Sequence, residues 1–235
     1  SVGDWVALQV YDGNSAIIHR IYPRLSIIKR QAVGISGEVQ VIATNINYAF
    51  LVQAADRDFN INRLERYLTI CHSAGVSPIG VLTKTDLSET ALVEEMVNQI
   101  KNRLKNLQIL TVSNLSKEGL QNLENIIEAG KTYCMLGSSG VGKSSLMNNL
   151  SGRETMRTGA TSDSTSKGRH VTSHRELIVL ESGGILIDNP GMREVGIADS
   201  GSGLESTFDN IALLSEQCKF SDCTHTNDTG CAVID

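Results

Sequence analysis

The sequence predicts an α/β fold with a mostly parallel sheet, preceded by a small β module and followed by a short cysteine-bearing segment. Two observations lead to this prediction. From about residue 39 onward, short apolar strands alternate with helices, which is typical of parallel sheets joined by helical crossovers. Between one of these strands and the following helix lies a glycine-rich turn, residues 137–142, as expected for a strand-to-helix junction in such a fold.

Length and composition exclude several classes of protein. The chain has 235 residues, 40% of them hydrophobic and only three of them proline, which excludes a collagen-like or wholly disordered chain. No apolar run approaches the ~20 residues that span a bilayer, and no signal-peptide pattern is present, so we expect a cytoplasmic protein without a membrane partner. The net charge of −5 gives no overall electrostatic reason to bind nucleic acid.

Residues 1–40 are expected to form a small β module of the OB type. Three β-like runs cover residues 5–10, 15–21 and 25–29, and Asp12-Gly13-Asn14 predicts a hairpin turn between the first two. The basic residues of this segment are Arg20, Arg24, Lys29 and Arg30. A solvated basic surface is the plainer interpretation of these residues, and an RNA-binding face is the functional one.

Residues 41–198 are expected to form the α/β domain. Strands are predicted at residues 39–43, 49–52, 79–82, 109–112 and 133–136. One helix is expected to be capped by Asn62 and stopped by Gly75, a second follows Ser88, and a third covers residues 120–127 and ends at Gly130.

The rest of the chain carries two further expectations. Residues 178–180 and 185–187 flank Ser182-Gly183-Gly184 and predict a hairpin, whereas the polar segment 153–175 predicts a long loop. Residues 199–235 are expected to form a separate module that is helical over residues 204–214.

The glycine-rich turn matches the phosphate-loop pattern G-x-x-x-x-G-K-[ST]. Its residues are Gly137, Ser138, Ser139, Gly140, Val141, Gly142, Lys143 and Ser144, and we count Ser145 with them. The glycines let backbone N–H groups surround phosphate oxygens, Lys143 can reach the β- and γ-phosphates, and Ser144 can ligate Mg²⁺. The helix that begins at Lys143 adds the positive end of its dipole. A glycine-rich loop without a ligand is the alternative.

Asp188-Asn189-Pro190-Gly191 follows a predicted strand downstream of the phosphate loop. A carboxylate at this strand end can hold Mg²⁺, directly or through water, and Gly191 can offer its N–H to a γ-phosphate. A plain strand-ending turn is the alternative interpretation of this segment.

Two short segments at strand ends suggest a site that reads guanine. Thr83-Lys84-Thr85-Asp86 ends one strand, and the Asp86 carboxylate can accept hydrogen bonds from guanine N1 and N2, which adenine cannot provide. Lys84 can lie along the base. Ser113 and Asn114 end the next strand, where a backbone N–H can reach guanine O6. Each segment alone would be read as an ordinary loop; the α/β context and the phosphate loop favour the functional reading.

Four metal-ligand residues crowd together near the C-terminus. Cys218, Cys223, His225 and Cys231 supply three thiolates and an imidazole, the set typical of a closed, structural zinc site. The alternative is a set of free thiols on a flexible tail. Cys71 and Cys134 lie on apolar segments and are expected in the core. An odd cysteine count with such a cluster indicates a reducing compartment.

The order of these motifs resembles a circularly permuted GTPase, because the base-reading segments precede the phosphate loop and Asp188 comes last. Together with the N-terminal VGDWV and the cysteine cluster, essentially the whole chain resembles the ribosome small-subunit-dependent GTPase A family, RsgA or YjeQ. The resemblance implies an OB-fold, a permuted P-loop GTPase domain and a zinc-binding module. It implies GTP hydrolysis stimulated by the small ribosomal subunit in late subunit maturation, with binding to rRNA. The chain begins at Ser1 rather than at a methionine, in what looks like the middle of a strand, so we expect it to be incomplete at that end. The resemblance implies that it is also truncated at the other end, where it stops four residues after Cys231.

The resemblance also assigns residues inside the polar segment and marks two departures. Thr172 is expected to be the switch residue on Mg²⁺, with Ser173 and Thr165 as competitors. Met192 stands where Ras-like enzymes place a water-orienting Gln, so His170 is the catalytic candidate, against the alternative of a solvated loop histidine. Thr83 stands in place of the usual Asn, so one amide between the base motif and the phosphate loop is expected to be lost.

Three functions follow as hypotheses. The first is a Mg²⁺-dependent GTPase with GTP and GDP, the small ribosomal subunit and its rRNA as partners, acting as a monomer. The second is a nucleotide-gated RNA-binding module without catalysis. The third is a P-loop ATPase or kinase, which equal affinity for ATP and GTP would favour.

Overall fold

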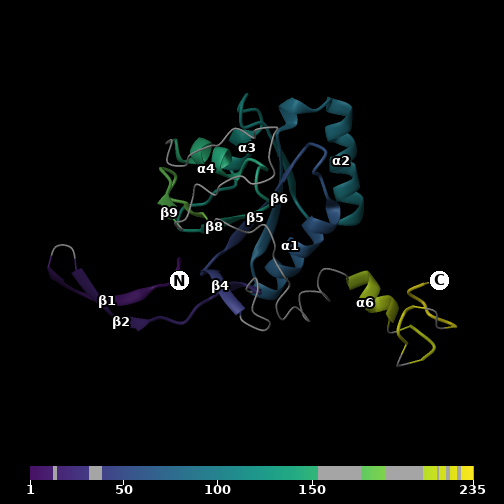
Figure 1. Cartoon of the computed structure of the whole chain (residues 1–235), viewed down its shortest axis with the longest axis horizontal. Helices are drawn as coiled ribbons and strands as arrows, with labels where there is room; N and C mark the ends of the chain where they lie inside the picture. Colours follow the sequence, from purple (N-terminus) through teal and green to yellow (C-terminus); the bar gives the residue numbers. More distant parts are fainter. Residues whose placement is uncertain are drawn as a thin grey trace, which may run out of the picture.

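A six-stranded sheet is the centre of the computed structural model, which describes residues 1–12, 15–31, 39–152, 176–188, 209–215, 217–220, 223–226 and 229–234. Among these residues, the strand order is β7-β6-β5-β8-β10-β9, and only β9 is antiparallel to its neighbour (Figure 1). The strands are β5 (Tyr48–Ala54), β6 (Ser77–Thr83), β7 (Ile109–Val112), β8 (Thr132–Leu136), β9 (Glu176–Val179) and β10 (Ile185–Asp188). The mostly parallel α/β fold and the hairpin of β9 and β10 are confirmed.

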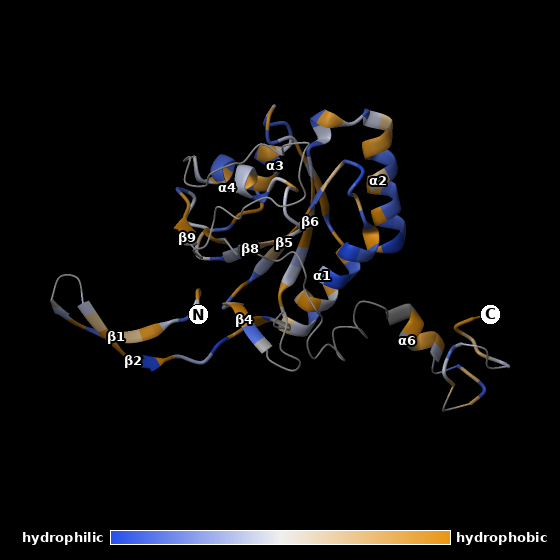
Figure 2. Ribbon diagram, viewed as in Figure 1, coloured by the Kyte–Doolittle hydropathy of each residue, from blue (hydrophilic) through white to orange (hydrophobic). Residues whose placement is uncertain are grey.

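Helices cover both faces of this sheet. The helices are α1 (Ile61–Ala74), α2 (Thr90–Arg103), α3 (Leu120–Glu124) and α4 (Lys143–Ser151). Side chains alternate along β5, so Leu51 packs with residues of α1 and α2, and Phe50 packs with residues of α3 and α4. Figure 2 shows α2 with hydrophobic residues toward the sheet and hydrophilic residues outward. The sheet is therefore buried on both faces, as its apolar strands require.

The ends of the helices correct two expectations. The cap of α1 is Asn60, not Asn62: its Oδ1 accepts the N–H of Arg63, and its own N–H donates to Gln53 of β5. This tertiary contact fixes the start of the helix two residues before the predicted position. Gly75 closes α1 in the left-handed conformation, as predicted. The third helix is shorter than expected and ends at Glu124.

The N-terminal strands form hairpins. β1 (Val6–Asp12) pairs with β2 (Ser15–Ile21), and β3 (Ile27–Gln31) pairs with β4 (Val39–Thr44). β4, which the sequence places at the start of the α/β region, therefore does not join the central sheet. In the described part of the chain these pairs are separate two-stranded sheets. The OB-type barrel and the domain divisions at residues 40 and 198 stay predictions.

The C-terminal part contains one described helix, α6 (Asp209–Ser215), which overlaps the predicted helical range of residues 204–214 and ends one residue beyond it. The rest of that range, residues 204–208, and the polar segment 153–175 lie outside the described residues. No helix in the described ranges is both long and apolar enough to cross a membrane.

Candidate nucleotide and metal sites

The predicted motifs meet at one edge of the sheet. The strands β6, β7, β8 and β10 are parallel, so the segments that follow them lie at the same carboxyl edge. The chain runs from β5 outward to β7 and then returns to β8 on the other side of β5. This reversal is a topological switch point, where open α/β sheets bind their ligands. The predicted base-reading segments, which follow β6 and β7, lie on one side of this switch point, and the predicted phosphate loop, which follows β8, lies on the other.

The phosphate loop needs its glycines for steric reasons. A Cβ at Gly137 would come within 2.5 Å of the Val52 carbonyl oxygen. Gly142 has φ 91° and caps α4, and a Cβ there would lie 2.7 Å from the Asn114 amide nitrogen. The loop is thus wrapped closely by β5 and by the segment after β7.

Lys143 folds over the loop that precedes it. Its Nζ donates to the carbonyl oxygens of Gly137 at 2.7 Å and Ser138 at 2.6 Å. Ser144 follows in the first turn of α4. The ammonium group and the N-terminus of the helix therefore lie at the same place, which suits an anionic phosphate chain.

The Asp86 carboxylate is held in place by the next strand. The Ser113 hydroxyl donates to Asp86 Oδ1 at 2.6 Å, and the Ser113 oxygen accepts the N–H of Ser116 at 3.0 Å. Ser113 itself is buried. Because the Ser113 hydroxyl has a partner on both sides, it holds the Asp86 carboxylate in one orientation.

Thr83 has no side-chain amide to offer the phosphate loop, as expected, but its hydroxyl makes a contact that the sequence did not predict. Its buried hydroxyl lies 2.5 Å from the Val141 carbonyl oxygen and 3.0 Å from that of Gln53. The Asn114 amide adds a second connection, donating to the Gly142 carbonyl at 3.1 Å. A short hydroxyl and a neighbouring amide thus provide the contact that the sequence pattern lacks.

Asp56 contacts a candidate site residue although no sequence motif marks it. Asp56, just after β5, lies 3.1 Å from Lys84 Nζ through Oδ2 and accepts the Asp58 N–H through Oδ1. Its position at the end of a strand in the same sheet is the signal that sequence reasoning passed over.

Tyr67 of α1 is buried, and burial raises the pKa of its hydroxyl, while a hydrogen bond with the Ser138 side chain acts in the opposite direction. Its place in the apolar period of α1 predicted only a core residue.

The remaining predicted residues of the site are only partly placed. Asp188 ends β10, and the preceding Ile187 pairs with Cys134 of β8, so the backbone of Asp188 lies beside the strand that leads into the phosphate loop. A carboxylate and the Ser144 hydroxyl offer the oxygen ligands that Mg²⁺ prefers. The other candidates lie outside the described residues: Thr165, His170, Thr172, Ser173, Gly191 and Met192.

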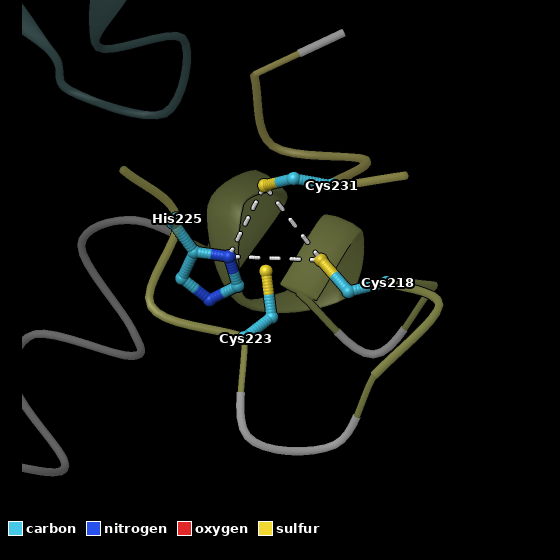
Figure 3. Close-up of side chains that lie close together, drawn as sticks. All are labelled: Cys218, Cys223, His225 and Cys231. Atoms are coloured by element: carbon cyan, nitrogen blue, oxygen red, sulfur yellow. Dashed lines mark hydrogen bonds between the residues drawn. The ribbon is translucent and has the colours of Figure 1, made fainter. Parts of the chain in front are cut away.

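The cysteine and histidine cluster has the dimensions of a tetrahedral metal site (Figure 3). The ligand atoms of Cys218, Cys223, His225 and Cys231 all lie within 4.8 Å of one another. Cys218 Sγ lies 3.6 Å from His225 Nδ1 and 4.0 Å from Cys231 Sγ, and His225 Nδ1 lies 3.4 Å from Cys231 Sγ. Zn–S and Zn–N bonds at tetrahedral angles put ligand atoms about 3.6–3.8 Å apart, so the residues fit zinc.

The other cysteines are core residues, as predicted. Cys71 and Cys134 are fully buried, and burial raises the pKa of Cys134 to about 12. A thiol that stays protonated is neither a metal ligand nor a nucleophile.

Comparison with known proteins agrees with this geometry. The sequence model described as RsgA GTPase matches residues 21–198, which is most of the chain. The chain belongs to the RsgA GTPase family. A curated relative from Listeria monocytogenes serotype 4b, named small ribosomal subunit biogenesis GTPase RsgA 2, is 41% identical over 233 residues, 99% of this chain and 65% of the relative. The RsgA of Methanosarcina acetivorans is 40% identical over 99% of this chain and 63% of its own length.

Two solved structures share the fold of this chain. YjeQ from Thermotoga maritima matches with a TM-score of 0.70 and 22% identity, over 99% of this chain and 75% of that one. YloQ, described as a circularly permuted GTPase, matches with a TM-score of 0.67 and 25% identity, over 99% and 72%. The permuted α/β fold predicted from the motif order is thus confirmed, and this RsgA-family chain spans a little under two thirds of the length of its first curated relatives.

Proposed function

We propose that this chain binds guanine nucleotides at the carboxyl edge of its sheet and hydrolyses GTP to GDP and phosphate. One observation carries the proposal: the Asp86 segment and the phosphate loop lie at the same edge and are tied together by the hydroxyl of Thr83 and the amide of Asn114. A base and a phosphate chain on one nucleotide require these two parts at a fixed separation.

Guanine selection rests on Asp86 and the backbone of Asn114. The carboxylate, oriented by Ser113, accepts hydrogen bonds from guanine N1–H and the N2 amine. Adenine has no N1–H and no amine at C2, so it would leave the carboxylate unpaired, which costs more than the lost bond itself. The Lys84 stem, held by Asp56, is proposed to lie along the base.

Phosphate handling falls to the loop at residues 137–145. Lys143 is proposed to leave the carbonyls of Gly137 and Ser138 and donate to phosphate oxygens. Mg²⁺ would be held by Ser144, Asp188 and Thr172, and when bound it neutralises charge that develops on the phosphate oxygens. Since Met192 cannot orient water, His170 is proposed to do so, and turnover without a partner is expected to be slow, about 10⁻⁴–10⁻² s⁻¹.

The proposed partner is the small ribosomal subunit. The curated relatives are named small ribosomal subunit biogenesis GTPases, and the match covers 99% of this chain. We propose that docking on the subunit and its rRNA stimulates hydrolysis in late maturation, that the chain acts as a monomer in the cytoplasm, and that zinc orders the C-terminal segment. Thiolate ligands and the buried thiols Cys71 and Cys134 suit a reducing compartment.

The test is phosphate release from GTP and from ATP, with and without purified small subunits. We expect release from GTP alone, with subunits raising the rate by at least about tenfold. Lys143→Ala should abolish the stimulated rate, because the ammonium group that contacts the phosphates is gone. The matched control is Lys101→Ala on the exposed surface of α2, which should behave as wild type.

Other outcomes discriminate the alternatives. Equal release from ATP and GTP would indicate an ATPase or kinase and refute the role of Asp86. Tight GTP binding with no release above background, even with subunits, would indicate a nucleotide-gated RNA-binding module. Release from GTP that subunits do not change would leave the site chemistry standing and refute the proposed partner.

A further inference from the structure

Asn149 lies near the end of α4, about one turn beyond the phosphate loop and outside every recognised motif. Its side-chain amide donates to the backbone carbonyl of Asn114 at 3.0 Å and lies 3.4 Å from Asn114 Oδ1. Asn114 in turn donates through its own amide to Gly142 at 3.1 Å. Asn114 is therefore held at both its backbone carbonyl and its side chain by the phosphate-loop helix.

These contacts hold the residue whose backbone N–H is of interest, Asn114. The preceding N–H, that of Ser113, donates to the Glu118 carbonyl at 3.0 Å and so fixes the turn after β7. In contrast, the backbone N–H of Asn114 donates to no acceptor in the described part of the chain. A half-buried donor at the edge where Asp86 is held is suited to the exocyclic oxygen of guanine.

We propose that Asn149 is a positioning residue for guanine recognition, which holds the Asn114 peptide so that its N–H meets O6 of the base. The inference rests on the proposed function and deepens it. Two peptide groups flank Asn114, and fixing its carbonyl and its side chain restricts rotation of both. Loss of the Asn149 amide leaves the Asn114 carbonyl without this donor and frees the N–H from its fixed direction.

The residue type matters because the contact needs a donor. An aspartate has the same shape, but its carboxylate would face the Asn114 carbonyl oxygen with no hydrogen to donate. Asn149→Asp therefore removes the contact without opening a cavity, and Asn149→Ala removes it without adding charge. The two variants together separate loss of the hydrogen bond from a change in packing.

The experiment pairs each variant with a change of one ligand atom. Equilibrium dissociation constants are measured for GDP and 6-thio-GDP, whose sulfur accepts hydrogen bonds poorly. Wild type should prefer GDP. In both variants GDP binding should weaken by about three- to tenfold, the effect of one hydrogen bond. Binding of 6-thio-GDP should weaken much less, so the preference for GDP should fall at least about threefold.

Asn102→Ala on the exposed side of α2 is the matched control and should leave both constants unchanged. Thermal unfolding of each variant checks folding, and if the alanine variant does not fold, the aspartate variant carries the test. Equal weakening of both ligands, or no weakening of either, overturns the role of Asn149. If wild type does not distinguish GDP from ADP, the proposed function itself fails, whatever Asn149 does.

Discussion

Asp4 shows how a single residue ties the start of the chain to later parts of the N-terminal segment. Its carboxylate is buried and accepts two hydrogen bonds from Arg24, at 2.7 and 2.8 Å, and one from Thr44 of β4 at 2.8 Å. The Arg24 contact is the main reason that the pKa of Asp4 lies well below its ordinary value. The charged form is therefore the one that stabilises the fold.

The pH dependence follows from the direction of that shift. A carboxyl group whose pKa is lower in the folded state contributes stability above its unfolded value of about 3.9 and loses that contribution as the pH falls toward the folded value. Asp4→Asn should lower the thermal midpoint at pH 7 by about 2–4 °C, and the difference from wild type should narrow below about pH 4. Asp58→Asn, an exposed aspartate, is the control. A difference that stays constant down to pH 3 would contradict this account.

The residues of a motif could be predicted from the sequence, but the side chains and backbone groups that they contact could not. The phosphate-loop pattern located Lys143 and Ser144, because glycine spacing is a local property of the chain. The contact of the Thr83 hydroxyl was not predicted, since a hydroxyl reaches Val141 only if β6 and the loop come close, which no local pattern encodes. Asp56 and Tyr67 were missed for the same reason: their contacts join separate elements.

The elements differ in how they are stabilised. Strands and helices of the sheet region share a buried core, whereas the described residues after α6 contribute only one fully buried side chain, that of Cys231. The described residues between 217 and 234 bury little apolar surface, so we expect a metal to supply much of the folding energy of this segment.

Removal of the metal should therefore destabilise the C-terminal segment and leave the central sheet folded. We expect one zinc ion per chain by metal analysis, lost in Cys231→Ser and kept in Cys71→Ala, a core cysteine. A chelator should raise hydrogen exchange in residues 209–234 and leave the strands β5 and β8 protected, because those strands have their own core. Zinc retained by Cys231→Ser, or exchange rising equally in the sheet, would count against the site.

Element types were predictable where the apolar period was strong, and element boundaries were less so. The strand at β7 was predicted to the residue, because four apolar or β-branched residues stand between polar segments. The cap of α1 was misplaced by two residues because Asn60 is selected by Gln53, a contact across elements. The pairing of β4 with β3 likewise depends on register between strands, not on either sequence alone.

For the whole molecule, the order of motifs was the decisive signal. Permuting a GTPase moves the chain ends but leaves each loop at the carboxyl edge of its strand, so the sequence order predicted the fold although the sheet order was not predicted. In the structure, β5 lies between the strands that lead into the predicted base-reading segments, β6 and β7, and the strand that leads into the phosphate loop, β8. The side chains of Thr83 and Asn114 reach from the first group to the phosphate loop. We propose that these parts form a single guanine-nucleotide site.

The most direct test of that claim is competition of GDP, XDP and ADP against a fluorescent GDP, for wild type and for Asp86→Asn. Wild type should bind GDP more tightly than XDP or ADP by about 10- to 100-fold, because a charged acceptor faces two donors on guanine. Asp86→Asn presents an amide donor to the C2 oxygen of xanthine, so its preference should change to XDP. Equal binding of ADP and GDP by wild type, or a variant that still prefers GDP, would contradict the account.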